Sequence, residues 1–176
     1  MSQKGYIHVY TGNGKGKTTA ALGLAVRAAG HGFRTYFAQF MKKQHYGELD
    51  AVRDHLSGLI TMEQFGIEGF HSSGMEVKKE EREAAREGLA AVDSAMRDGR
   101  YRIIVMDEIN VTLHFGILDP EPVLNLIRKR PGNIELILTG RYAPPEVVAI
   151  ADLVTEMREI RHYYASGVPA RDGVER

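Results

Sequence analysis

A glycine- and lysine-rich stretch near the start of the chain has the composition of a phosphate-binding loop. It covers residues 11–19 (TGNGKGKTT), after an apolar strand predicted over 6–10 and before a helix predicted over 20–29. Glycines let the backbone curl so that N–H groups point at phosphate oxygens, and the helix adds the positive end of its dipole. This order of strand, loop and helix predicts a nucleoside triphosphate site, rather than a glycine-rich turn beside a basic surface.

The predicted roles within the loop differ from residue to residue. Lys17 is placed to neutralise phosphate charge, and the hydroxyl of Thr18 to ligate Mg²⁺. The usual pattern G-x-x-x-x-G-K-[ST] has its first glycine where this chain has Thr11, and Lys15 adds a second cation. The residues expected to bind the nucleotide here are Gly12, Asn13, Gly14, Lys15, Gly16, Lys17, Thr18 and Thr19.

Two carboxylates follow the apolar strand predicted over 102–107. Asp107 and Glu108 would lie at the carboxyl end of a central strand, where Mg²⁺ is held in nucleotide-binding folds of this kind. Magnesium takes oxygen ligands and keeps several waters, so one or two carboxylates suffice. The alternative is that Asp107 only caps the strand and bonds the backbone of the phosphate loop.

Three further polar residues follow predicted strands. Arg141 comes after the strand 134–139, where a guanidinium could grip triphosphate oxygens, although it could equally be a surface arginine. Gln39 and Lys42 lie at the carboxyl end of the strand predicted over 34–40. That position favours contact with a ligand, whereas lysines on loops are usually solvated.

The elements that must position these residues alternate between strand and helix. Beyond those already named, helices are predicted over 47–56, 76–98, 120–130 and 144–150, and strands over 59–65 and 153–160. The pattern predicts an α/β fold, a P-loop NTPase-like (RecA-like) three-layer structure with a mainly parallel central sheet. Residues 1–176 are expected to form one domain, with 163–176 as a C-terminal tail.

Composition narrows the classes of function. The 23 basic and 23 acidic residues give a formal net charge of zero, so no strong field draws the chain to nucleic acid or membranes. The absence of cysteine excludes disulfides, thiolate metal sites and a cysteine nucleophile. No secretory leader or spanning segment is evident, so a cytoplasmic enzyme is expected.

Taken together, these motifs are similar to those of the bacterial ATP:corrinoid adenosyltransferases that make coenzyme B12. The resemblance extends over nearly the whole chain. Its blocks are YTGNGKGKTTAA (10–21), AQF (38–40), VMDEIN (105–110), LTGR (138–141), ADLVTEM (151–157) and GVPARDGVE (167–175).

The resemblance implies a reaction in which the Co(I) of a reduced corrinoid attacks the 5′ carbon of ATP and inorganic triphosphate leaves. Lys15, Lys17 and Arg141, with Mg²⁺ on Thr18, Glu108 and Asp107, would then stabilise the leaving group. ATP would lie reversed in the loop relative to common P-loop NTPases. Cobalt is the nucleophile, so no general base is needed. A flavoprotein or similar reductase and a second copy of the chain are the partners to expect.

One loop departs from the family pattern. Familiar members carry a phenylalanine closely followed by tryptophan, which presses on the corrinoid and displaces its lower axial ligand. Here Phe70 matches the phenylalanine, His71 and Ser72 follow it, and the chain has no tryptophan. Phe70 is expected to face the corrinoid, with a plain core aromatic as the alternative. His71 is a candidate cobalt ligand.

Two rival functions and an open question about the tail remain. A conventional P-loop hydrolase or kinase would release ADP, and a carrier would bind nucleotide or corrinoid without turnover. In the tail, Tyr163, Tyr164, Arg171 and Glu175 could close over the site, stabilise a dimer or fray.

Overall fold

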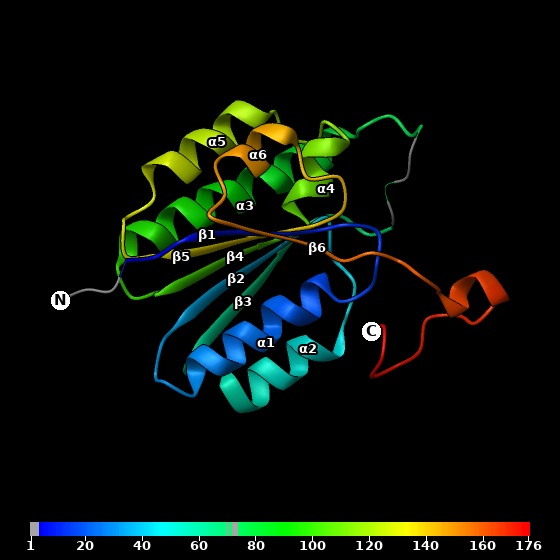
Figure 1. Cartoon of the computed structure of the whole chain (residues 1–176), viewed down its shortest axis with the longest axis horizontal. Coiled ribbons are helices and arrows are strands. Elements are labelled where there is room, and N and C mark those ends of the chain that lie inside the picture. Colours follow the sequence, from blue (N-terminus) through cyan, green and yellow to red (C-terminus); the bar gives the residue numbers. More distant parts are fainter. Residues whose placement is uncertain (1–3, 70, 72–73) are drawn as a thin grey trace.

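The computed structural model describes residues 4–69, 71 and 74–176, which form a six-stranded parallel sheet covered by helices on both faces (Figure 1). The strand order is β3-β2-β4-β5-β1-β6. In chain order the strands are β1 (Ile7–Thr11), β2 (Thr35–Phe40), β3 (Ile60–Phe65), β4 (Ile103–Asp107), β5 (Glu135–Thr139) and β6 (Leu153–Glu156). The predicted three-layer α/β fold with a parallel sheet is confirmed.

The helices divide between the two faces of the sheet. Figure 1 shows α1 and α2 on one face and α3 to α6 on the other. Their bounds are α1 (Lys17–Ala29), α2 (Gly47–Ala51), α3 (Lys79–Asp98), α4 (Ile109–His114), α5 (Pro120–Lys129) and α6 (Pro145–Ala149). A π-helical turn, η1 (Val52–Leu56), continues α2, and a 3-10 helix, η2 (Tyr163–Ser166), lies in the tail.

Two hydrophobic clusters hold the layers together. Ala21 and Ala25 of α1 pack with Phe37 and Val105 on one face of the sheet. A larger cluster on the other face joins side chains of α3, α4 and α5 to the sheet. Strands buried on both faces need continuous apolar runs, and β2 and β4 have this character because every residue of each is buried.

Polar residues interrupt these apolar strands at their carboxyl ends. Gln39 of β2 pairs in register with Asp107 of β4, and Thr139 ends the next strand, β5. Parallel pairing therefore brings three polar side chains to one edge of the sheet. β5 lies between β4 and β1, the strand that leads into the phosphate loop.

Most predicted elements are present, with differences at their ends. The helix α4 was not predicted: the chain turns at Glu108 in a left-handed conformation (φ 63°) and begins a helix at once. The last strand ends at Glu156 rather than 160, and α3 begins at Lys79 rather than 76. Within residues 4–69, 71 and 74–176, none of the helices combines the length and apolar character needed to cross a membrane.

Candidate active site

The phosphate loop is held in shape by two glycines and by contact with Met157, which directly follows β6. Gly12 (φ 92°) and Gly16 (φ 121°) have backbone angles that side-chain-bearing residues rarely adopt. A Cβ atom on Gly12 would lie 2.4 Å from the carbonyl oxygen of Met157, and the N–H of Gly14 donates to the same oxygen at 2.7 Å. Glycine is therefore required at Gly12 both by its backbone angle and by the close approach of Met157.

Lys17 is buried within this loop, with 7% of the residue exposed. Its ammonium group donates to the carbonyl oxygens of Gly12 and Gly14, both at 2.7 Å. Burial lowers the pKa of Lys17 below the ordinary lysine value, while the carboxylates of Glu108 and Asp107 oppose that shift. A partly desolvated cation placed in this way attracts anions more strongly than a solvated lysine would.

Asp107 joins the phosphate loop to the end of β4 and is fully buried. Its Oδ1 accepts from the hydroxyl of Thr18 at 2.9 Å and from the hydroxyl of Thr139 at 2.6 Å. Its Oδ2 accepts from the ammonium group of Lys42 at 2.8 Å. Both oxygens of the carboxylate therefore have hydrogen-bond partners, as a buried charge requires.

Glu108 lies beside Asp107 and has a left-handed backbone conformation. Its backbone N–H donates a hydrogen bond to the hydroxyl oxygen of Thr139 at 3.0 Å. Burial and the neighbouring Asp107 raise the pKa of the Glu108 carboxyl, against the pull of nearby cations. Together with Thr18, the two carboxylates offer the hard oxygen ligands that Mg²⁺ prefers. Among the residues that the structure describes, no group of three or more His, Asp or Glu could hold a metal by itself. The donor set therefore fits a cation that also takes water and phosphate oxygens.

Gln39 lies behind Asp107, fully buried. Its amide nitrogen is 3.4 Å from Asp107 Oδ2 and 3.2 Å from Glu48 Oε1. Its oxygen accepts from the amide of Gln64 at 3.1 Å. The structure thus places Gln39 where it supports Asp107, and its predicted contact with ligand stays a prediction.

Arg141 emerges at the same edge of the sheet, after Gly140 at the end of β5. Gly140 has φ 127°, and its carbonyl accepts from the buried side chain of Asn110 at 3.3 Å. The guanidinium of Arg141 is not anchored in the core, because the residue is exposed. Arg141 therefore lies at this edge of the sheet with its side chain open to solvent.

Two cavities meet above these residues. The first, of about 680 Å³, is lined by the phosphate loop, the start of α2 and the end of the tail. The second, of about 630 Å³, has a more apolar wall that includes Val111, Phe115 and Tyr142. We call them the phosphate cavity and the apolar cleft. Among the described residues, both are lined by Lys42, Tyr46, Glu108 and Arg141.

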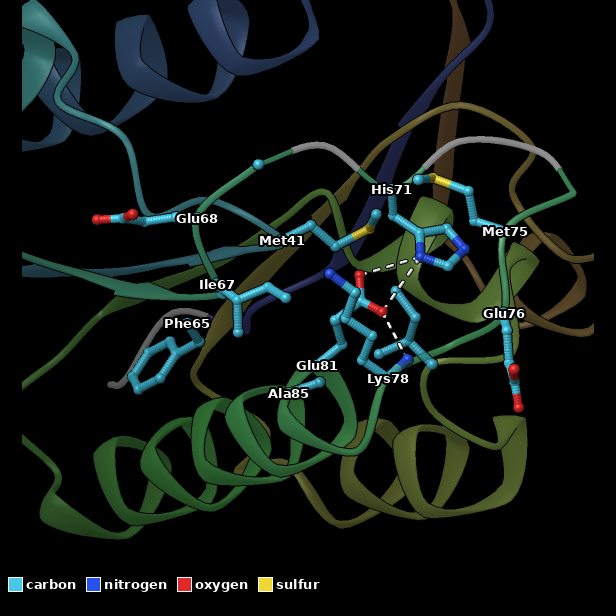
Figure 2. Close-up of a pocket in the computed structure, with 13 residues that line it drawn as sticks. Met41, Phe65, Ile67, Glu68, His71, Met75, Glu76, Lys78, Glu81 and Ala85 are labelled. Carbon is cyan, nitrogen blue, oxygen red and sulfur yellow. Dashed lines mark hydrogen bonds and ion pairs between the residues drawn. The ribbon is translucent and has the colours of Figure 1, made fainter.

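A smaller pocket of about 250 Å³ lies beyond the apolar cleft, between the loop after β3 and the start of α3 (Figure 2). One of its lining residues is His71, whose side chain is 4% exposed and whose Nδ1 lies 3.0 Å from the Glu81 carboxylate. Glu81 also accepts from the N–H of Lys78 at 2.8 Å, and the ring of His71 packs against Phe115. The Glu81 contact leaves Nε2 of His71 as the nitrogen that could meet a ligand, and the role of His71 stays a prediction.

The other residues predicted for the site fall into two groups. Phe70, predicted to face the corrinoid, and Ser72 lie outside the described residues. Asn13 and Thr19 line the phosphate cavity, as do Gly14, Lys15, Gly16 and Lys17. Of the predicted loop residues, all but Gly12 thus line one cavity.

The C-terminal tail lies against the phosphate loop. Lys15 donates to the carbonyl oxygen of Val174 at 2.7 Å and is 3.6 Å from the Glu175 carboxylate. Hydrogen bonds from Arg171 and Tyr163 hold Glu175 and lower its pKa to about 2. Figure 1 shows this red segment reaching beyond the sheet and turning back toward the loop. The tail therefore contacts the phosphate loop, and its closure over the site stays a prediction.

Sequence reasoning missed or left open some residues of this site. Thr139, which contacts both Asp107 and Glu108, was passed over, although its place at the end of β5 is a usable signal. Glu48 was seen as part of a helix and not as a partner of Gln39. For Lys42 the sequence allowed either a solvated side chain or a contact with ligand. In the structure Lys42 forms an ion pair with the buried carboxylate of Asp107.

Comparison with known proteins yields one family. A family model described as ATP:corrinoid adenosyltransferase BtuR/CobO/CobP matches residues 3–176. A corrinoid adenosyltransferase of Sinorhizobium is 34% identical, over 98% of this chain and 81% of its own length. A corrinoid adenosyltransferase of Pseudomonas aeruginosa is 33% identical, over 98% of this chain and 84% of its own length. The corrinoid adenosyltransferase CobA of Salmonella typhimurium is 33% identical, over 99% and 87%.

Proposed function

The chain belongs to the ATP:corrinoid adenosyltransferase family, and on this premise we propose how its residues carry out the transfer. The enzyme moves the 5′-deoxyadenosyl group of ATP to the Co(I) of a reduced corrinoid and releases inorganic triphosphate, in coenzyme B12 synthesis or salvage. We propose that the triphosphate occupies the phosphate cavity and that the corrinoid approaches from the apolar cleft.

The observation that carries this proposal is the meeting of the two cavities. A nucleoside triphosphate needs a site lined by cations and backbone N–H groups, and the phosphate loop supplies one. A corrinoid needs a wide apolar wall, and Val111, Phe115 and Tyr142 belong to one. Because the cavities share Lys42, Tyr46, Glu108 and Arg141, a carbon at their junction can be reached by a nucleophile from the cleft.

In this proposal the cations stabilise the leaving group. The electron pair of Co(I) forms the cobalt–carbon bond, and the pair of the C5′–O bond departs with triphosphate. Lys15, Lys17 and Arg141 bind the phosphate oxygens, where fixed positive charge is worth most as negative charge develops. No side chain has to remove a proton, which agrees with a site built from cations and hydroxyls.

We propose that Thr18, Glu108 and Asp107 would hold Mg²⁺. Bound Mg²⁺ supplies a Lewis acid that neutralises charge on phosphate oxygens. Thr18 and Asp107 already share a hydrogen bond of 2.9 Å, so their oxygens are close before any cation binds. Thr139 orients both the Asp107 carboxylate and the backbone of Glu108.

The remaining partners follow from the chemistry of the substrate. Co(I) is a strong reductant that has to be generated by reduction of Co(II), and we propose that a flavoprotein or similar reductase supplies the electron to the corrinoid at the cleft. A cytoplasmic location is supported by the absence of cysteine from the sequence. A homodimer is the assembly that we propose to test by sedimentation.

The test is anaerobic and resolves the products. Purified protein, Mg²⁺, ATP and chemically reduced cob(I)alamin are mixed, the Co(I) absorbance is followed and the phosphate products are separated. Loss of Co(I) with one triphosphate for each adenosylcobalamin supports the proposal. ADP and phosphate with an untouched corrinoid would support a hydrolase instead. Binding of ATP without turnover would support a carrier.

A further inference from the structure

Lys42 has an unusual position for a lysine that follows a strand. Its ammonium group lies 2.8 Å from Asp107 Oδ2 and 3.5 Å from the hydroxyl of Thr18, and 5.3 Å from the ring centre of Tyr46. The side chain is 15% exposed, whereas the adjacent Lys43 is exposed. Lys42 is thus held by the chain at the acidic end of β4, before any ligand binds.

The charge of Lys42 is kept despite its burial. The ammonium group lies 2.8 Å from the Asp107 carboxylate, and this ion pair offsets the burial of the positive charge. A lysine in this position has one of two roles. It neutralises the buried carboxylate, or it binds an anionic group of a ligand.

The position of Lys42 between the two cavities favours the second of these roles. Lys42 lines both the phosphate cavity and the apolar cleft, while Lys15 and Lys17 line the phosphate cavity. In the proposed reaction the C5′–O bond of ATP breaks. Its carbon faces the apolar cleft, and its oxygen faces the phosphate loop. A cation at the junction is therefore beside the departing oxygen, and cations deeper in the loop are beside the far end of the triphosphate.

We propose that Lys42 is a catalytic residue of the adenosyl transfer, which binds the α-phosphate of ATP and stabilises the charge on the oxygen that leaves C5′. This inference rests on the proposed function. The cobalt–carbon bond forms from the Co(I) electron pair, the C5′–O pair passes to the leaving oxygen, and no proton is transferred. Asp107 holds the ammonium group ready, so little reorganisation is needed when that charge appears.

The test compares Lys42→Met and Lys42→Gln with Lys43→Met in the full chain. Gln keeps a donor for Asp107 and loses the charge, while Lys43 is the exposed neighbour and serves as the matched control. With ATP, Mg²⁺ and chemically reduced cob(I)alamin, both Lys42 variants should lose about 100-fold in kcat, the usual size for one oxyanion donor. The KM for ATP should change less than kcat.

A second readout does not depend on turnover. Titration calorimetry with Mg²⁺ and inorganic triphosphate should give a Kd about tenfold weaker for both Lys42 variants and unchanged for Lys43→Met. Thermal unfolding shows whether Lys42→Met has lost the fold by leaving Asp107 unpaired. In that case the proposal is tested on Lys42→Gln alone, because glutamine keeps a donor for Asp107.

Three outcomes would overturn the proposal. A wild-type kcat in Lys42→Gln would make Lys42 a positioning partner of Asp107. Equal losses in Lys43→Met would show a general effect of charge. If the wild-type protein itself forms no adenosylated corrinoid, the proposed function fails first and the role of Lys42 falls with it. The first two outcomes, obtained beside normal turnover by the wild-type protein, reject the role of Lys42 alone.

Discussion

The hydroxyl of Thr18, in the first turn of α1, donates to Oδ1 of Asp107, the last residue of β4, across 2.9 Å. The two residues are 89 positions apart, and β5 lies in the sheet between β4 and β1, the strand that leads into the phosphate loop. Their contact joins the phosphate loop to the acidic pair. Because the oxygens are already adjacent, a cation bound there would bridge the two halves of the nucleotide site.

Replacing Thr18 with valine tests that bridge. Valine keeps the shape and removes the oxygen, so binding of Mg²⁺ with ATP should weaken about 10- to 100-fold, as when a metal-site contact is lost. Asp107 retains Thr139 and Lys42 as partners, so unfolding should change little. Calorimetry with MgATP measures the effect, and Thr155→Val on the exposed strand β6 is the control. Unchanged MgATP affinity would remove Thr18 from the metal site.

Replacing Lys17 with alanine tests the phosphate loop itself. Loss of this buried cation should cost about 3 kcal/mol of transition-state stabilisation, or roughly 100-fold in rate. The reaction is measured with chemically reduced cob(I)alamin, and Lys79→Ala, at an exposed ion pair on α3, should be neutral. A wild-type rate in Lys17→Ala would contradict the placement of triphosphate in this loop.

Replacing Glu108 with glutamine should separate stability from activity. Its raised pKa means that the folded protein disfavours the ionised carboxyl at neutral pH. Glutamine removes that cost, so without nucleotide the variant should have a higher Tm than the wild-type protein at pH 7.5. The gain should shrink as pH falls through the raised pKa, because wild-type Glu108 then becomes neutral. Calorimetric unfolding at pH 5 and 7.5 checks this, and a lower Tm at pH 7.5 would refute it.

The tail should respond to acid through Glu175. Its pKa is lowered to about 2, first by Arg171 and then by Tyr163, from an ordinary value near 4.5. The depressed pKa stabilises the tail at pH above the ordinary value, and this contribution is lost as pH falls through about 2. An NMR titration of the Glu175 carboxyl should show a midpoint nearer 2 than 4.5. Glu175→Gln should expose Arg171 to trypsin at neutral pH, and equal cleavage of variant and wild type would argue against a docked tail.

A matched pair of glycine substitutions tests the geometry of the loop. Gly12→Ala places a Cβ 2.4 Å from the Met157 carbonyl at φ 92°, so it should destabilise the protein by at least about 2 kcal/mol. Gly23→Ala, in α1 and facing open space, should stabilise it by about 0.5–1 kcal/mol. Chemical denaturation measures both. If Gly12→Ala were neutral, the loop would be less constrained than the structure indicates.

Some differences between the predicted and the observed elements have a local cause. The strand 102–107 was predicted from its apolar run, but the helix α4 was not predicted. Six residues are too few to show helical periodicity, and the turn before it depends on a left-handed Glu108 that few residues other than glycine adopt. The shortened β6 has a different cause, because a strand ends where its partner ends. Thr11, paired with Glu156, is the last residue of β1.

The sequence by itself determined the phosphate loop, the alternation of strands and helices and the acidic end of β4, because each depends on neighbours within a few residues. Only the tertiary structure decided that Lys42 pairs with Asp107 and that Lys15 meets the chain at Val174, 159 positions away. Such contacts follow from the strand order and the path of the tail. Local pattern does not encode them, since one apolar strand can pair with several others and packing of the whole core selects among the pairings.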